Sequence, residues 1–277
     1  MTSAELKFLL NRYKLSPNKL RGQNFLVDDA ILDQIIYTAQ KREADLILEV
    51  GPGMGALTQR LILLGKPVVA LEIENNFKPL LDKLAVATGN LEIIWQDIMR
   101  LSPRQWQDIL ARYKVGTYQV VANIPYYLTG KFIQKFMTMH PAPSSLTLLL
   151  QKEVAERLVG QDKKNSLLSL AVGFYGQAEI ICLVDKKSFY PAPQVDSALV
   201  YIYNVKVWSH QVDEKKVWQL VKRGFAQKRK KLFNNLLTDT RLDREKLIGA
   251  FAAIGLDQNV RAEDLSVENW LILAKKL

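Results

Sequence analysis

The chain has 277 residues, of which 48% are hydrophobic and 24% charged, and its formal net charge is +10. This length and composition suit one large or two modest globular domains and exclude a mainly disordered, collagen-like or coiled-coil protein, and no apolar run approaches the roughly 18 residues of a membrane span. One cysteine, Cys182, and two histidines, His140 and His210, provide neither disulfides nor a set of metal ligands, so we expect a cytoplasmic protein with no membrane partner and no metal.

Short apolar runs alternate with helix-length segments over the first 205 residues. We predict strands at residues 45–50, 68–73, 91–96, 119–124, 146–150, 180–184 and 198–205. Helix-length segments at 57–64 and 77–87 lie between the early strands. This alternation predicts an α/β fold, in which helices cover both faces of a mostly parallel sheet.

The strand signals stop at about residue 205. Val217, Leu220 and Val221 follow at helical spacing, and further helical stretches lie at 244–254 and 267–276. We therefore predict an α/β domain of residues 1–205, with a basic N-terminal extension, and a small all-helical domain of residues 206–277.

The positive charge is concentrated at the two ends of the chain. Residues 1–22 hold five Lys and Arg against one Glu, and residues 206–277 hold fifteen basic against nine acidic residues. The segment between them is neutral, with eighteen residues of each sign. A polyanion bound by the ends explains this distribution, although a solvated helix face explains a modest excess equally well.

The first predicted strand runs into a glycine-rich loop, Gly51-Pro52-Gly53-Met54-Gly55, that opens a helix. Its G-x-G-x-G spacing differs from the dinucleotide fingerprint and no P-loop lysine follows, which disfavours oxidoreductases and nucleotide triphosphates. Glu72, about 20 residues further on, ends the second strand, where a carboxylate accepts hydrogen bonds from ribose. The carboxylate of Glu49, just before the loop, favours a cationic ligand over an anionic one. S-adenosylmethionine meets these conditions, although a glycine turn also serves packing alone.

The sequence Asn123-Ile124-Pro125-Tyr126 follows the fourth predicted strand, at the edge where open α/β sheets place their sites. An exocyclic amine on a nucleobase is a poor nucleophile, because its lone pair is delocalised into the ring. The Asn123 side-chain oxygen and the Pro125 carbonyl can accept the amine hydrogens, and Tyr126 can stack on the base. Taken alone, these four residues are equally typical of the start of an ordinary loop. Because they follow the glycine loop and Glu72 in the sequence, they indicate methylation of an amine.

In this order the motifs resemble those of the ribosomal RNA adenine N6-dimethyltransferase family, and most closely its bacterial members that act on 16S rRNA. The resemblance covers nearly the whole chain. It is carried by residues 22–26 (Gly-Gln-Asn-Phe-Leu), 49–58 (E-x-G-x-G-x-G-x-L-T), Glu72, 96–98 (Gln-Asp-Ile), 123–126, 151–158, 189–197, 225–231 and 261–266.

The resemblance implies a Rossmann-like S-adenosylmethionine-dependent methyltransferase with a helical C-terminal domain that docks on rRNA. It implies that Asn24 and Leu26 line the methionine end of the cofactor, with Gly51 beneath it, and that Glu72 binds the ribose. Asp97 and Ile73 are expected at the cofactor adenine. The same resemblance implies that Phe189 faces Tyr126 across a flipped-out adenine, although burial tendencies alone favour a core position for Phe189. The expected RNA contacts are Lys222, Arg223, Lys228, Arg229, Lys230 and Lys231.

The implied activity is transfer of two methyl groups to N6 of each of two adjacent adenosines near the 3′ end of 16S rRNA, in an immature 30S subunit, by a monomeric enzyme. Three residues depart from the family pattern: Ile124 replaces a leucine, Gln194 a lysine and Glu74 an aspartate. Isoleucine at position 124 also occurs in 23S rRNA methyltransferases that confer macrolide resistance, whereas residues 261–266 favour the small-subunit target. A non-catalytic RNA-binding assembly factor is the alternative from another class.

Overall fold

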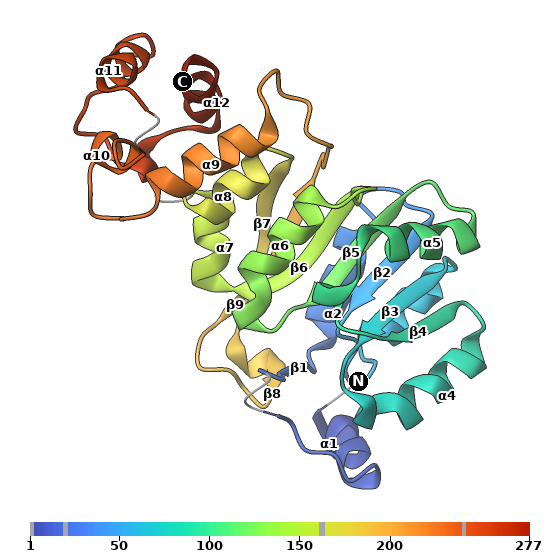
Figure 1. Ribbon diagram of the computed structural model, residues 1–277. Helices are drawn as coiled ribbons and strands as arrows, with labels where there is room; N and C mark the ends of the chain where they lie inside the picture. The colour runs from blue at the N-terminus through green and yellow to red at the C-terminus, as the bar shows by residue number, and fades with distance from the viewer. Residues whose placement is uncertain (1–2, 19–21, 161–163, 240–241) are drawn as a thin grey trace.

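A computed structural model describes residues 3–18, 22–160, 164–239 and 242–277. Its centre is a seven-stranded sheet in the order β4-β3-β2-β5-β6-β9-β7 (Figure 1). The strands are β2 (Leu46–Val50), β3 (Val68–Glu72), β4 (Leu91–Trp95), β5 (Tyr118–Asn123), β6 (Ser145–Gln151), β7 (Gln177–Val184) and β9 (Ser197–Tyr203). The pairs from β4 to β6 are parallel, and β9 is antiparallel to both β6 and β7. The predicted mostly parallel sheet is therefore confirmed.

Helices cover both faces of this sheet. Its strands are therefore buried on both sides, and alternate residues along a strand point to opposite faces. Leu46 and Leu48 belong to one apolar cluster, and Ile47 between them belongs to another. The first face is covered by α5 (Pro103–Tyr113), α6 (Thr129–Thr138), α7 (Lys152–Val159) and α8 (Leu167–Gly173). The second is covered by α2 (Asp29–Ala39), α3 (Thr58–Leu61) and α4 (Lys78–Thr88).

A two-stranded ribbon joins distant parts of the chain beside the main sheet. It consists of β1 (Phe25–Leu26) and β8 (Phe189–Tyr190), which pair antiparallel. The N-terminal helix α1 (Ser3–Arg12) packs nearby: its buried Leu6 and Leu10 belong to a cluster with Phe25, Met54 and Phe77. Leu81 of α4 belongs to the same cluster, and Figure 1 shows α1 below the main sheet. Two-residue strands are too short to show a period, so the sequence does not reveal them.

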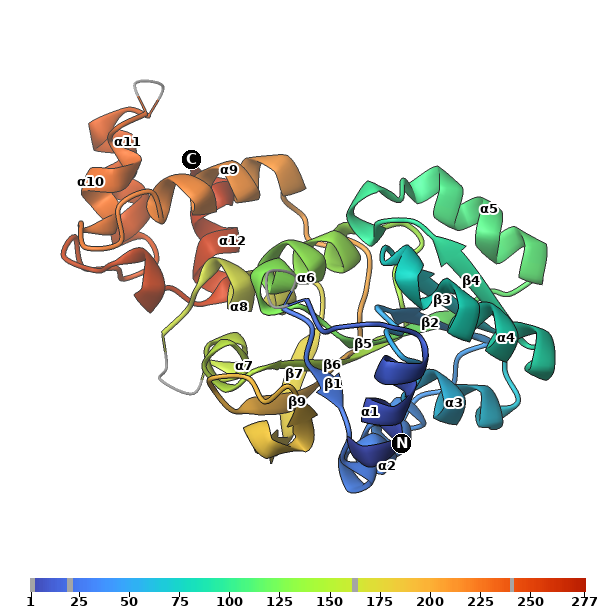
Figure 2. The same cartoon turned by 90° about the horizontal axis from the view of Figure 1, so that it is seen from below.

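The C-terminal part is helical, as predicted: it contains α9 (Glu214–Gly224), α10 (Leu232–Leu236), α11 (Arg244–Ala252) and α12 (Val267–Lys276). These helices lie together at one end of the sheet (Figures 1 and 2). Their apolar faces join the same cluster as the first face of the sheet, and the Tyr175 hydroxyl donates to Glu214 Oε1 at 2.6 Å. The division at residue 205 stays a prediction, since one continuous apolar cluster crosses it.

Candidate functional site

A pocket lies at the carboxyl ends of β2, β3, β4 and β5, the edge at which open α/β sheets bind ligands. We call it the edge pocket. Its lining includes every residue predicted to bind the cofactor and three of the four predicted to act on the base: Asn24, Leu26, Gly51, Glu72, Ile73, Asp97, Asn123, Pro125 and Tyr126. Adjacent parallel strands end side by side, so motifs that are far apart in sequence meet here.

The glycine loop forms one wall of the edge pocket with its backbone. Gly51, Gly53 and Gly55 all have positive φ values, of 74°, 54° and 79°, which L side chains rarely adopt. A Cβ added at Gly53 would lie 3.1 Å from the Phe25 ring, which is tighter than ordinary contact. Close approach of this backbone to the opposite wall therefore requires glycine at position 53.

Glu72 is fixed against the glycine loop by three amide groups. Its Oε1 accepts from the N–H groups of Ile73 at 2.7 Å and Glu74 at 2.8 Å, and its Oε2 accepts from Gly53 N–H at 3.1 Å. Burial raises the pKa of Glu72, and the amide donors act in the opposite direction. Because each carboxylate oxygen has several acceptor directions, Glu72 can still accept hydrogen bonds from a diol.

Glu49 is the most strongly perturbed carboxyl group at this edge. It is 1% exposed, and burial raises its pKa to about 8; the neighbouring Thr58 hydroxyl acts in the opposite direction, and the Glu72 charge adds a smaller increase. Thr58 is near enough to affect the carboxyl group, but among the described residues neither Glu49 Oε2 nor the Thr58 hydroxyl has a partner in hydrogen-bond geometry. A buried carboxyl group without a partner favours either a bound proton or a nearby cation.

Asp97 and Ile73 lie at the far side of the edge pocket, beyond β4 and β3. Asp97 Oδ1 accepts from the Met99 N–H at 2.8 Å, so this oxygen caps a short 3-10 helix, Ile98–Arg100. The second carboxylate oxygen can accept from a ligand amine. Ile73 is 47% exposed, as an apolar side chain that covers a ligand ring would be in the free protein.

Asn123 ends β5 with a defined amide orientation. Its Nδ2 donates to the Asn24 carbonyl at 3.0 Å, which leaves Oδ1 as the acceptor of an amide that lines the edge pocket. Asn24 Nδ2 in turn donates to the Gly22 carbonyl at 3.2 Å. The orientation predicted for an amine acceptor is therefore available, and Asn24 contributes to it through its backbone.

Pro125 and Tyr126 continue from Asn123 into a 3-10 turn, Tyr126–Leu128. The Pro125 carbonyl already accepts from Leu128 N–H at 3.0 Å, so one of its two acceptor directions remains for a ligand. The Tyr126 and Ser197 hydroxyls form a hydrogen bond of 3.1 Å, which ties the ring to the start of β9. Burial raises the pKa of Tyr126, which keeps its hydroxyl neutral.

Phe189 is placed differently from the other predicted residues. It is 4% exposed and packs with Leu26 and Leu32, and it does not belong to the described lining of the edge pocket. The structure therefore gives it the core position that burial tendencies favour. A clamp of Phe189 and Tyr126 around a base stays a prediction, which needs the Phe189 ring to become accessible.

A second cleft, the basic cleft, starts at Tyr126 and runs between α6, α7 and the C-terminal helices. Its lining includes Tyr126, Lys131, Arg157, Lys164, Trp218, Lys222, Phe225 and Lys228. Tyr126 thus belongs to both cavities. Cations beside aromatic rings suit single-stranded nucleic acid, because phosphates bind the cations and bases stack on the rings.

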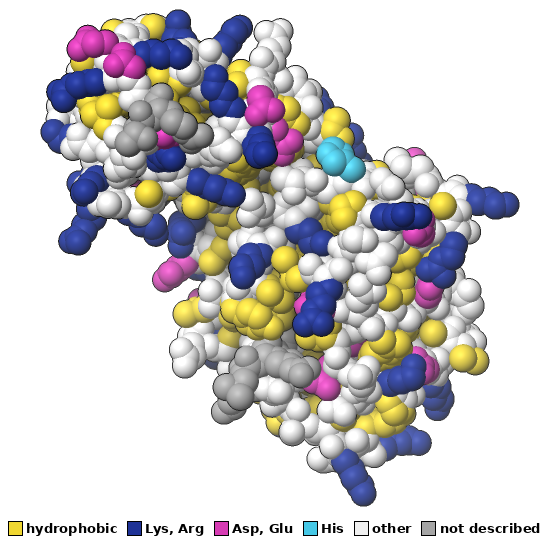
Figure 3. All heavy atoms as spheres, viewed as in Figure 1, with side chains coloured by type: hydrophobic (Ala, Val, Ile, Leu, Met, Phe, Trp, Pro, Cys, Tyr) yellow, Lys and Arg dark blue, Asp and Glu magenta, His cyan; other side chains and the backbone are white. Residues whose placement is uncertain are grey.

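The six predicted RNA contacts separate into groups. Lys222 and Lys228 line the basic cleft, whereas Arg223 forms an ion pair with Asp239. Arg229, Lys230 and Lys231 line a separate shallow groove with Asn234 and Leu237. On the face drawn in Figure 3, Lys and Arg side chains are spread over the C-terminal helices. Which of these six residues bind RNA stays a prediction.

Charge counted along the chain did not reveal three cations of the basic cleft: Lys131, Arg157 and Lys164. All three belong to the neutral middle segment; Lys131 comes from α6 and Arg157 from α7. Arg157 belongs to the run 151–158 that carries the family resemblance, but the sequence does not show that Arg157 lies in one cleft with residues of the C-terminal helices. Ile124 is 3% exposed and packs in the core, and it also lines the edge pocket, so this departure from the family pattern lies at the site itself.

The edge pocket fits a phosphate-free cationic ligand such as S-adenosylmethionine. Its described lining contains three carboxyl groups, Glu49, Glu72 and Asp97, and no Lys, Arg or His. Such a lining repels phosphates and attracts a sulfonium. Among the described residues, no group of three or more His, Cys, Asp or Glu side chains is arranged to hold a metal ion, and no helix has the length and apolarity to cross a membrane.

Comparison with known proteins supports the same chemistry. A family model described as ribosomal RNA adenine dimethylase matches residues 15–277. Proteins called ribosomal RNA small subunit methyltransferase A are similar over nearly the full length. The one from Bacillus licheniformis is 36% identical, covering 100% of this chain and 96% of that protein, and the one from Dehalococcoides mccartyi is 34% identical, covering 98% and 91%.

Solved structures agree on the fold. A dimethyladenosine transferase from Plasmodium falciparum has a TM-score of 0.73 at 25% identity, covering 90% of this chain and 95% of that chain. The 23S rRNA methyltransferase ErmE has a TM-score of 0.69 at 23% identity, covering 92% and 99%. The similarity to ErmE is evidence for the fold alone, which is the Rossmann-like class I methyltransferase fold expected from the sequence.

Proposed function

Because this chain belongs to the ribosomal RNA adenine dimethylase family, and is therefore an S-adenosylmethionine-dependent rRNA adenine methyltransferase, we propose that it dimethylates N6 of two adjacent adenosines near the 3′ end of 16S rRNA. The observation that carries the chemistry is the orientation of Asn123, whose Nδ2 donates to the Asn24 carbonyl at 3.0 Å and whose Oδ1 is left to accept from an amine. The small-subunit target follows from the full-length relatives.

Different residues at the carboxyl edge of the sheet would bind different parts of the cofactor. Glu72 would hold the ribose hydroxyls of the cofactor, Asp97 its adenine amine, and Asn24, Leu26 and Gly51 its methionine end. Bound S-adenosylmethionine supplies an electrophilic methyl group on a positively charged sulfur. Glu49 is buried, its Oε2 has no partner in hydrogen-bond geometry among the described residues, and its carboxyl group favours that positive charge.

The acceptor residues prepare the target amine. Asn123 Oδ1 and the free acceptor direction of the Pro125 carbonyl draw the two amine hydrogens to one side, so the nitrogen lone pair turns out of the ring plane. Tyr126, held by Ser197, stacks on the base and limits its rotation. After methyl transfer the cationic nitrogen is acidic enough to lose its proton to water, so these steps need no strong base and no metal.

The RNA reaches the edge pocket through the basic cleft in this proposal. Tyr126 lines both cavities, so a base flipped out of a strand in the cleft enters beside Asn123. Lys131 and Arg157 contribute from residues 1–205, and Lys222 and Lys228 from the helical domain proposed for residues 206–277. We propose that the protein acts as a cytoplasmic monomer on an immature 30S subunit.

Mass spectrometry of rRNA tests the proposal. RNA from cells with the gene should contain N6,N6-dimethyladenosine at the two adjacent positions, and RNA from cells without it should lack it; the same content in both contradicts the function. Transfer of labelled methyl groups should occur on 30S precursors and not on protein-free 23S rRNA. The reverse result would assign the 23S activity, and a titration without S-adenosylmethionine binding would assign a non-catalytic assembly factor.

A further inference from the structure

Asp28 joins two segments of the chain that lie far apart in sequence. Its Oδ1 accepts from the N–H groups of Ala30 at 3.0 Å and Ile31 at 3.3 Å, and so caps α2. Its Oδ2 accepts from the Ser188 hydroxyl at 2.8 Å, across 160 residues. A second contact runs beside it, from Val27 N–H to the Ser188 carbonyl at 2.9 Å. We call these two contacts the clasp.

A helix cap alone needs only one of the two carboxylate oxygens. Asp243, which caps α11, accepts from the Lys246 N–H through one oxygen and has no long-range partner among the described residues. At Asp28 the second oxygen accepts from the hydroxyl of the buried Ser188 on another segment, and a hydrogen bond to an ionised acceptor is stronger than a neutral one. The clasp is therefore an additional interaction and not part of the cap.

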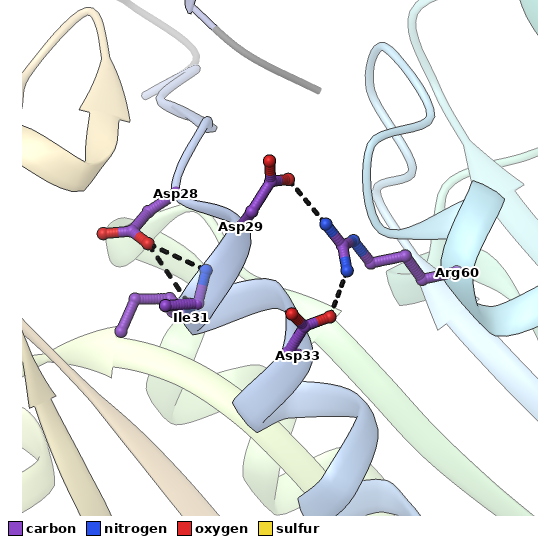
Figure 4. A network of polar contacts seen from close by, with 6 residues as sticks. Asp28, Asp29, Ile31, Asp33 and Arg60 are labelled. Carbon is purple, nitrogen blue, oxygen red and sulfur yellow. Dashed lines mark hydrogen bonds and ion pairs between the residues drawn. The ribbon is translucent and has the colours of Figure 1, made fainter.

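The helix start that carries Asp28 is held in place from its other side. Figure 4 shows the Asp28 carboxylate turned toward the first turn of α2, while Asp29 and Asp33 both reach Arg60. Arg60 lies in α3, so these ion pairs join α2 to the helix that follows the glycine loop. Ser188 is thereby attached to a fixed support.

The clasp holds the two-stranded ribbon of β1 and β8, which contains Phe189. This ribbon has two residue pairs, Phe25 with Tyr190 and Leu26 with Phe189. Two strands this short are only marginally stable, and a slip of one residue would turn Phe189 to the opposite face. Ser188 immediately precedes β8, and Val27 immediately follows β1, so the clasp closes the open end of the ribbon.

We propose that Asp28 is a positioning residue for methyl transfer, which acts through Ser188 to keep Phe189 in register with Leu26. Leu26, which lines the edge pocket, and Phe189 then keep a fixed position relative to each other. This inference rests on the proposed function and on the prediction that Phe189 acts across the base from Tyr126, for which the Phe189 ring must become accessible while its backbone stays paired with Leu26. It assigns to Asp28 a role at the active site although its side chain does not line the edge pocket.

Two substitutions open the clasp from opposite sides. Asp28→Ser keeps a good helix cap but is too short to reach Ser188, and Ser188→Ala removes the hydroxyl while the cap stays intact. We expect each to lower kcat about tenfold, which corresponds to ~1.4 kcal/mol in the barrier. The double variant should lose no more than either single variant, because both remove one interaction. The KM for S-adenosylmethionine should change little.

Asp28→Asn and Asp243→Ser are the controls. Asn caps a helix as well as Asp does, and its amide can donate to the Ser188 oxygen, so Asp28→Asn should restore kcat. Asp243→Ser makes the same replacement at a helix cap in the C-terminal part and should leave kcat unchanged. A general loss of stability would affect Asp243→Ser as well, so the comparison separates positioning from structural damage.

Hydrogen exchange of the Val27 amide provides a readout without catalysis. Its N–H bonds to the Ser188 carbonyl, so it should exchange faster in Asp28→Ser and Ser188→Ala and at the wild-type rate in Asp28→Asn. Unchanged exchange and unchanged kcat in Ser188→Ala would overturn the proposal, as would additive losses in the double variant. If the wild-type protein does not methylate 16S rRNA, the proposed function fails, and Val27 exchange still decides whether the clasp exists.

Discussion

Glu49 makes the stability of this protein depend on pH in a way that Glu49→Gln removes. Its carboxyl group is 1% exposed, and burial raises its pKa from the ordinary 4.5 to about 8. A carboxyl group whose pKa is raised by folding stabilises the folded state fully at pH values below the unfolded pKa. This contribution is lost as the pH rises through the folded pKa, so the affected window runs from about pH 4.5 to pH 8.

The magnitude follows from the size of the shift. Within the window, the folded protein holds one more proton than the unfolded chain, and stability falls by up to about 1.4 kcal/mol for each pH unit. Over the whole window the loss is roughly 3–5 kcal/mol, a large fraction of the ~5–15 kcal/mol of a typical domain. Glu49→Gln has no proton to lose, so its stability relative to wild type should increase steadily with pH.

Urea unfolding of the cofactor-free protein at pH 5.5, 6.5, 7.5 and 8.5 measures this difference. Subtracting the wild-type free energy of unfolding from that of Glu49→Gln removes the contribution of every other titrating group. Asp82→Asn is a matched control, since it neutralises a carboxylate whose side chain is 45% exposed, and it should give a flat difference. Parallel curves for wild type and Glu49→Gln would refute the reasoning.

The same group links cofactor binding to pH. A sulfonium near Glu49 favours its carboxylate, so binding of S-adenosylmethionine should release a proton below about pH 8. The affinity for S-adenosylmethionine relative to the uncharged-sulfur product S-adenosylhomocysteine should therefore rise between pH 6 and pH 8 in wild type. In Glu49→Gln this ratio should stay constant, as calorimetry of both ligands can establish.

Three further predictions concern the base site, the glycine loop and the basic cleft. Asn123→Ala should lower kcat by about 10²–10³ with much smaller changes in cofactor and RNA affinity, because the lost acceptor acts mainly in the transition state. Single-turnover kinetics measure the rate and binding titrations the affinities, and an equal loss of binding contradicts this role of Asn123. Gly53→Ala should cost about 1–2 kcal/mol of stability from its φ of 54° alone, and should weaken S-adenosylhomocysteine binding as the new Cβ displaces the Phe25 ring; unchanged urea unfolding and affinity would be the contrary result. Lys222→Ala and Lys228→Ala should each reduce the slope of log affinity for RNA against log salt by about 1, and unchanged slopes would exclude both from phosphate contact.

The family sequence motifs located the edge pocket because each belongs to a local structure that the sequence specifies. The glycine loop, Glu72 and Asn123 all directly follow or end buried strands, and parallel strands place such positions at one edge. The apolar period of the strands and of α9, α11 and α12 was equally visible. Local periodicity and chain connectivity were therefore sufficient for the fold class and for the glycine loop, Glu72 and residues 123–126, whereas Asn24, Leu26, Ile73 and Asp97 were expected from the family resemblance.

Tertiary packing alone decided which side chains are buried, paired or brought together from distant segments. It placed Phe189 in the core beside Leu26, left Glu49 Oε2 without a partner in hydrogen-bond geometry among the described residues, and joined Asp28 to Ser188. It also gathered Lys131 and Arg157 into the basic cleft, although the segment that contains them has no net charge. Burial, desolvation and pairing depend on neighbours across many residues, and hydrophobic periodicity within one segment carries no information about those neighbours.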